Sequence, residues 1–125
     1  MNPIIPVLEN IIVILLIGKY DDRRAEELII RTLEIAKQYQ AKFMVLGVAV
    51  LTEWNDYYIH MLDRLTNAVR LIGASVILVG ISPSLGVQLV HFAFDPEGIA
   101  CFSTLKHGIY YWLLMEGFSI IKNEK

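Results

Sequence analysis

Short apolar runs alternate with longer amphipathic segments along the whole chain. The apolar runs predict strands, whose expected positions are Ile4–Ile5, Ile11–Ile17, a run within Lys42–Leu51, Ser75–Gly80 and Ile99–Phe102. The run Ile11–Ile17 is apolar at every position and rich in β-branched residues, which is typical of a strand covered on both faces. Pro3 and Pro6 flank the first strand and favour a short strand at the edge of the sheet.

The amphipathic segments have apolar residues at spacings of three and four, and they predict helices. Their expected ranges are from Asp21 or Asp22 to Tyr39, from Thr52 to Ile72, Pro83–Phe94, and from Ser103 or Thr104 to the neighbourhood of Ile121. The apolar stripes of the first two helices include Tyr39 and Ile72, so both side chains are expected in the core. The alternation predicts an α/β sandwich, with a mixed, mainly parallel sheet of about five strands covered by about four helices.

Composition adds an expectation about the surface. The chain of 125 residues predicts one domain, residues 1–125. Its hydrophobic content of 55% exceeds the usual range of about 45–50%, so part of the surface is expected to lie against a partner or a second copy. A net charge of −2 without a basic run argues against a nucleic-acid partner.

The lengths of the apolar segments and the use of cysteine indicate the cellular compartment of the chain. The longest apolar runs, Ile11–Ile17 and Ile109–Met115, are shorter than the roughly 18 residues of a membrane span. The N-terminus lacks the positive first segment of a signal peptide, and the single Cys101 fits a reducing compartment. These observations predict a cytoplasmic domain without a membrane span.

The residue types that most often carry chemistry are scattered. His60, His91 and His107 fall on three different predicted helices without ligand spacing, so they are interpreted as surface or interface residues, and no metal or cofactor is expected. Cys101 lies on a predicted buried strand and is interpreted as an inert core thiol. No catalytic residue is predicted.

Two loops after strands allow other interpretations. Ser82, Pro83 and Ser84 form a helix start, where Ser82 is expected to cap the helix and a weak anion contact is conceivable. Asp21 and Asp22, with Glu53 and Asp56, follow two predicted strands and could form an acidic magnesium pocket. A receiver domain would also need an acid at the end of the third strand, where Val45–Val48 has none.

Taken together, several segments resemble the STAS domain of bacterial anti-sigma-factor antagonists and stressosome scaffold proteins. The segments that carry the resemblance are Ile4–Asp21, Gly47–Glu53, Leu71–Ala74, Gly80–Pro83, Leu89–Asp95 and Ser103–Leu105. The resemblance covers nearly the whole chain. It implies a STAS-like sandwich and a non-catalytic regulatory module that docks on other proteins.

The resemblance also implies a phosphoswitch, and this chain departs from the family pattern there. In the family, a partner kinase phosphorylates a serine or threonine at the start of the second helix, where this chain has Thr52-Glu53. Glu53 occupies the acceptor position with a fixed negative charge, and Thr52 is a candidate for a shifted acceptor. Gln88 occupies the position of a second acceptor on the third helix and cannot be phosphorylated.

By the same resemblance, a docking surface is expected around the starts of the second and third helices. Its expected residues are Thr52, Glu53, Asn55, Asp56, Tyr57, Ser82, Ser84 and Gln88. The implied partners are a serine/threonine kinase or anti-sigma factor and other STAS proteins, in a homo-oligomer or a larger assembly. One alternative is a STAS-like sensor that binds a small anion, nucleotide or lipid. Another is an enzyme that uses Asp21, Asp22 and Asp56 with a metal ion.

Overall fold

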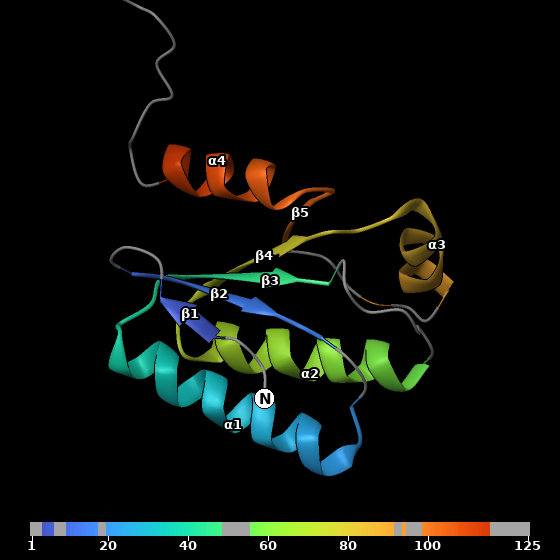
Figure 1. The fold of residues 1–125 in the computed structure, drawn as a ribbon, viewed down its shortest axis with the longest axis horizontal. Coiled ribbons are helices and arrows are strands. Elements are labelled where there is room, and N and C mark those ends of the chain that lie inside the picture. Colours follow the sequence, from blue (N-terminus) through green and yellow to red (C-terminus); the bar gives the residue numbers. More distant parts are fainter. Residues whose placement is uncertain are drawn as a thin grey trace, which may run out of the picture.

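A five-stranded sheet runs through the middle of the molecule (Figure 1). The computed structural model describes residues 4–6, 10–17, 20–48, 56–91, 94 and 99–115. Its strands are β1 (Ile4–Pro6), β2 (Ile11–Leu15), β3 (Phe43–Gly47), β4 (Ser75–Val79) and β5 (Ala100–Phe102). Its helices are α1 (Asp22–Gln38), α2 (Asp56–Leu71), α3 (Pro83–His91) and α4 (Leu105–Met115).

The strands lie in the sheet in the order in which they occur in the chain. β1 pairs with β2 antiparallel, whereas the pairs β2–β3, β3–β4 and β4–β5 are parallel. Ile11 lies opposite Phe43, and Phe43 lies opposite Ser75, so β2, β3 and β4 start in register. A helix connects each parallel pair, as parallel strands require. The predicted α/β sandwich with a mainly parallel sheet is confirmed.

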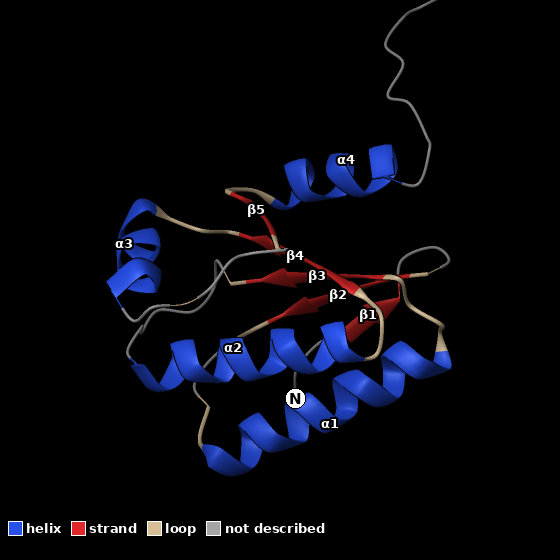
Figure 2. Cartoon of the chain, turned by 180° about the vertical axis from the view of Figure 1, so that it is seen from behind, coloured by secondary structure: helices blue, strands red, loops and turns tan. Residues whose placement is uncertain are grey.

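Helices cover both faces of the sheet. α1 and α2 lie side by side on one face, and α4 lies on the opposite face (Figure 1 and Figure 2). Ile12 and Ile14 of β2 join the core under α1 and α2, whereas Ile11 and Val13 join the core that contains Trp112 of α4. Because neighbouring residues of a strand point to opposite faces, a strand between two helical layers must be apolar at every position, as predicted for this run.

Three helices begin at side chains that satisfy free backbone amides. A carboxylate oxygen of Asp21 accepts a hydrogen bond from the Arg24 amide at 2.8 Å. The Ser82 hydroxyl accepts from the Leu85 amide at 3.1 Å, as predicted. Thr104 Oγ1 accepts from the His107 amide at 3.2 Å. Each bond spans three residues, which is the geometry of an N-terminal cap.

Several predicted boundaries and burials were wrong. β2 ends at Leu15 and α3 ends at His91, both earlier than predicted. Tyr39 is 45% exposed and Ile72 is 49% exposed, although both were expected in the core. The reason is that α1 and α2 end before these positions, so the helical spacing that placed them inward no longer holds. The expected end of the last helix near Ile121 lies outside the described residues.

Cys101 is a second correction, because its side chain is exposed. β5 has three residues and pairs with β4 at one edge of the described sheet. Phe102 packs against the core below α4, and its neighbour Cys101 therefore points to the other side. Partial burial still raises the pKa of the Cys101 thiol, which disfavours the reactive thiolate.

A buried hydroxyl on α1 leads to a first prediction. Thr32 is fully buried, and its hydroxyl has no hydrogen-bond partner among the described residues. Thr32→Val keeps the shape and removes the unsatisfied group, so we expect the free energy of unfolding to rise by about 1 kcal/mol. Urea unfolding followed by circular dichroism measures this change in the free energy of unfolding.

The matched control for this prediction is Thr66→Val on α2. Thr66 is equally buried, but its hydroxyl donates to the Asp63 carbonyl at 3.0 Å. This variant loses a satisfied bond, so we expect a free energy of unfolding that is unchanged or lower by about 1 kcal/mol. Destabilisation by Thr32→Val would mean that its hydroxyl has a partner after all.

Candidate functional site

The candidate site lies at the carboxyl edge of the parallel strands. α1 follows β2, α2 follows β3 and α3 follows β4, so all three helices begin at this edge (Figure 1). Helix N-termini carry partial positive charge and free amides, and ligands or partners of parallel sheets usually bind at this edge. The site is therefore described from the three helix starts.

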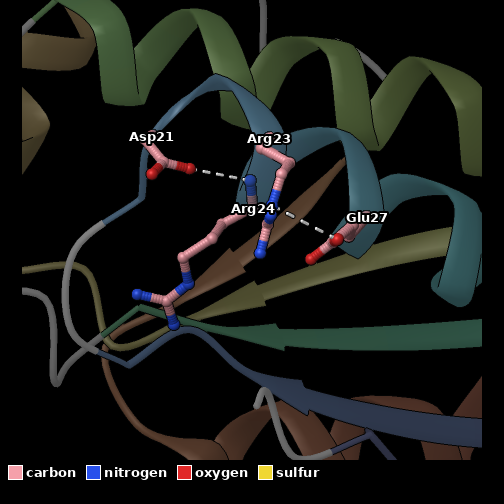
Figure 3. Close-up of polar contacts among 4 residues, drawn as sticks. All are labelled: Asp21, Arg23, Arg24 and Glu27. Carbon is pink, nitrogen blue, oxygen red and sulfur yellow. Dashed lines mark hydrogen bonds and ion pairs between the residues drawn. The ribbon is translucent and has the colours of Figure 1, made fainter.

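The start of α1 presents charged side chains in two different settings. Arg23 lies 3.6 Å from Glu27, one turn later, in an exposed ion pair. The Arg24 guanidinium instead stacks over the Tyr20 ring, 5.2 Å from its centroid. Figure 3 shows Arg24 extending away from α1 and away from Glu27. Arg24 thus places a positive charge close to the loop that precedes α1.

The start of α2 contacts this loop through a buried tyrosine. Tyr20 and Tyr58 are each 5% exposed, and their rings meet edge to face with centroids 6.4 Å apart. The Tyr58 hydroxyl accepts a hydrogen bond from the Tyr20 amide at 3.2 Å, and the Tyr20 hydroxyl accepts from the Ile17 amide at 3.2 Å. Burial raises the pKa of Tyr20, so its hydroxyl stays protonated at neutral pH.

Tyr57 makes a second contact between the two helix starts. Its ring packs edge to face on Tyr58, with centroids 5.6 Å apart. Desolvation raises the pKa of Tyr57, and the nearby Asp22 carboxylate raises it further. The first turn of α2 therefore contacts both the loop before α1 and the first turn of α1.

The start of α3 combines polar and apolar exposed groups. The Ser82 and Ser84 hydroxyls lie 3.4 Å apart, and Ser82 also caps the helix. One turn further along, Gln88 is half-buried. Val87 is 70% exposed and Val90 is 81% exposed, so the outer face of α3 is apolar.

The predicted docking residues divide into two groups. Thr52, Glu53 and Asn55 lie outside the described residues, as does the side chain of Asp56, whose backbone begins α2. Of the other four, Tyr57, Ser82 and Ser84 lie in the first turns of α2 and α3 or just before them, at the same edge of the sheet. Gln88 lies one turn further along α3.

Sequence reasoning missed the polar roles of Tyr20, Tyr58 and Arg24. Tyr58 is buried, and its hydroxyl accepts a hydrogen bond from the Tyr20 amide, 38 residues away in the chain. A weak signal existed: both tyrosines lie within three residues of the start of a helix.

The described residues contain no group of three or more histidine, cysteine or acidic side chains that could hold a metal ion. His60, His91 and His107 lie on α2, α3 and α4 respectively, and His107 Nδ1 is 2.7 Å from Thr104 Oγ1. In the acidic pocket considered above, Asp21 serves as a helix cap. Within the same residues, no helix has the length and hydropathy that a membrane crossing requires.

Comparison with known sequences finds regulatory proteins. No protein-family profile matches the chain. It is 29% identical over 119 residues to the RsbT co-antagonist protein RsbRA of Bacillus subtilis, covering 95% of this chain and 43% of that protein. It is 34% identical over 110 residues to the RsbT co-antagonist protein RsbRC of the same organism, covering 86% of this chain and 38% of that protein. The chain thus spans less than half the length of these relatives.

Solved structures share the fold along nearly the whole chain. A serine-to-glutamate variant of RsbS from Moorella thermoacetica has a TM-score of 0.81 at 19% identity, covering 94% of this chain and 98% of that chain. The anti-sigma-factor antagonist SpoIIAA in its unphosphorylated form has a TM-score of 0.71 at 15% identity, covering 98% of this chain and 100% of that chain. A structure of the stressosome gives a TM-score of 0.82 at 19% identity, covering 91% of this chain and 98% of that chain. With the sequence relatives, this fold identifies the chain as a STAS domain.

Proposed function

We propose that this chain is a regulatory module that docks on other proteins and catalyses no reaction of its own. Its relatives RsbRA and RsbRC are named as co-antagonists of RsbT, which supports a role in protein interaction. The fold it shares with SpoIIAA and with a stressosome structure supports the same role. The proposed partners are a serine/threonine kinase or an anti-sigma factor, and other STAS proteins, including further copies of this chain.

The observation that carries this proposal is the uncovered apolar face of α3 beside the polar helix starts. Val87 and Val90 are more exposed than most large apolar residues of a folded domain, and exposed apolar groups with a polar rim are typical of docking surfaces. By contrast, α1 carries exposed ion pairs such as Arg23–Glu27 and Arg31–Glu34, which favour solvent. The docking surface is therefore proposed at the carboxyl edge, around α2 and α3.

Regulation of this surface is proposed to depend on charge just before α2. Glu53 would supply a permanent negative charge where the family has its phosphoacceptor, and Thr52 would be the residue available for phosphorylation. Negative charge is favourable at a helix N-terminus, and a phosphate adds nearly two further charges. Gln88 leaves the second acceptor position of the family without a hydroxyl.

Affinity purification of the tagged chain from its native cells tests the proposal, with copurifying proteins and phosphorylated residues identified by mass spectrometry. We expect a kinase, an anti-sigma factor or other STAS proteins to copurify. Phosphate on Thr52 would support the shifted acceptor. Recovery of the chain alone and unmodified would contradict the proposed function.

A further inference from the structure

The two edges of the sheet are protected to different degrees against pairing with another chain. β1, at one edge, contains Pro6 and follows Pro3, and proline has no amide to donate to an added strand. β5, at the other edge, pairs with β4 alone among the described residues. The segment Ile99–Ser103, which contains β5, has neither a proline nor a charged side chain. Of these protective features, β5 therefore has only its length of three residues.

The backbone of Cys101 faces the open side of β5. The Gly80 amide donates to the Phe102 carbonyl at 3.0 Å, so the backbone groups of Phe102 face β4. In a parallel ladder, the amide and carbonyl of one residue face the same neighbouring strand, and those of the next residue face the opposite side. The amide and carbonyl of Cys101 therefore point away from β4, where no described strand lies. They can donate one hydrogen bond to an added strand and accept one from it.

A second copy of this chain fits this edge because the segment is self-complementary. When two β5 strands lie antiparallel about a twofold axis at Cys101, each Cys101 amide faces the Cys101 carbonyl of the other copy. Ile99 then lies opposite Ser103, and no charged side chain meets another of the same sign. The axis is perpendicular to the sheet, so both Cys101 side chains, which are exposed, lie on the same face and opposite each other.

We propose that a second copy of this chain docks on β5 by antiparallel strand pairing centred on Cys101, which joins the two five-stranded sheets into one. This inference rests on the proposed function and deepens it, because it names the surface for the further copies of this chain among the proposed partners. The paired segment is short and interfaces of small area are weak, so we expect a reversible equilibrium between monomer and dimer.

Analytical ultracentrifugation of the purified full chain, combined with amide hydrogen exchange measured by NMR, tests the pairing. We expect a monomer–dimer equilibrium in which the Cys101 amide exchanges about tenfold more slowly at millimolar than at micromolar concentration. The Gly80 amide is the internal reference, because its bond to Phe102 lies within one copy and its exchange should not depend on concentration. A chain that stays monomeric, or a dimer in which exchange at Cys101 is independent of concentration, would overturn the proposal.

Substitutions of Cys101 test whether this residue lies on the axis. Cys101→Lys brings two like charges together there and should weaken the dimer at least about tenfold. Cys101→Thr is the matched control, because it introduces a small side chain that favours strands, and it should dimerise as the unchanged chain does. The side chain of Cys101 is exposed, so both variants should give the circular dichroism spectrum of the unchanged chain. Equal dimerisation of the two folded variants would contradict the proposed axis.

Oxidation of the unchanged chain with diamide tests the register of the two strands. The two Cys101 α-carbons should lie about 5.5 Å apart, a separation that a disulfide spans. The two thiols give two protons and two electrons to diamide as the sulfur–sulfur bond forms. The matched control combines Cys101→Ser with Ser103→Cys, which moves the α-carbons of the two thiols to roughly 14 Å apart.

We expect a disulfide-linked dimer of the unchanged chain and none of the control. Equal cross-linking of both would show random encounter and overturn the register. These measurements need no partner other than this chain. A monomeric chain that still binds a kinase or an anti-sigma factor would therefore overturn this inference alone and leave the proposed function standing.

Discussion

Gly108→Ala should destabilise the domain and loosen α4 from the sheet. A Cβ at this position would lie 2.5 Å from Val79 Cγ1 and 3.3 Å from Ile77 Cγ2, and both side chains belong to the buried core below α4. A valine on a buried central strand cannot move aside freely, so overpacking should cost about 1–3 kcal/mol. Alanine favours helices more than glycine by about 1 kcal/mol, which offsets part of this loss. We expect a net loss of up to about 2 kcal/mol in urea unfolding.

Gly86→Ala is the matched control, because this glycine lies in α3 with no atom within 4 Å of an added Cβ. Only the helix preference remains, so we expect stabilisation by about 0.5–1 kcal/mol. Hydrogen exchange should accelerate in α4 of the Gly108 variant and in no element of the Gly86 variant. Equal effects of the two substitutions would show that α4 does not pack closely on β4.

Glu53→Lys should weaken binding of the partner that copurifies with the chain by at least about tenfold. The substitution reverses the charge at the proposed switch position, three positions before the first residue of α2. Asp56→Lys, at the first residue of α2, should act in the same direction. Isothermal titration calorimetry with the purified partner gives the dissociation constants.

The fold should survive both charge reversals. A lysine near a helix N-terminus loses a favourable interaction with the helix dipole, at a cost of about 0.3–1 kcal/mol. Glu34→Lys is the control for charge: it lies on the exposed side of α1, where its pair with Arg31 is long at 4.0 Å. That variant should bind normally. Unfolding of Glu53→Lys, or unchanged affinity, would count against the proposed surface.

Local features of the fold were predictable from the sequence, whereas the positions at which helices end were not. The cap at Ser82 was predictable because the serine and the amide that it satisfies are three residues apart. The burial of β2 was predictable because a strand between two helical layers is apolar at every position. The predicted burial of Tyr39 and Ile72 was wrong because the spacing of apolar residues does not show where a helix ends.

The candidate site was predictable only in its location. Parallel strands and their helices place the starts of α2 and α3 at one edge, so Tyr57, Ser82 and Ser84 were expected near one another there. The edge-to-face contact of Tyr57 with Tyr58 was not predictable. The expected core position of Cys101 was wrong because the exposure of an edge strand depends on which helices reach over it.

The sequence by itself determined the order of strands and helices, the caps at their starts and the two-sided burial of the central strands. These features follow from neighbours a few residues apart or from apolar spacing along one element. The tertiary structure alone decided that Tyr58 satisfies the amide of Tyr20 and that Arg24 stacks on Tyr20. The bond between Tyr58 and Tyr20 forms because α1 and α2 pack side by side on the same face of the sheet, which brings residues 38 positions apart within hydrogen-bond distance.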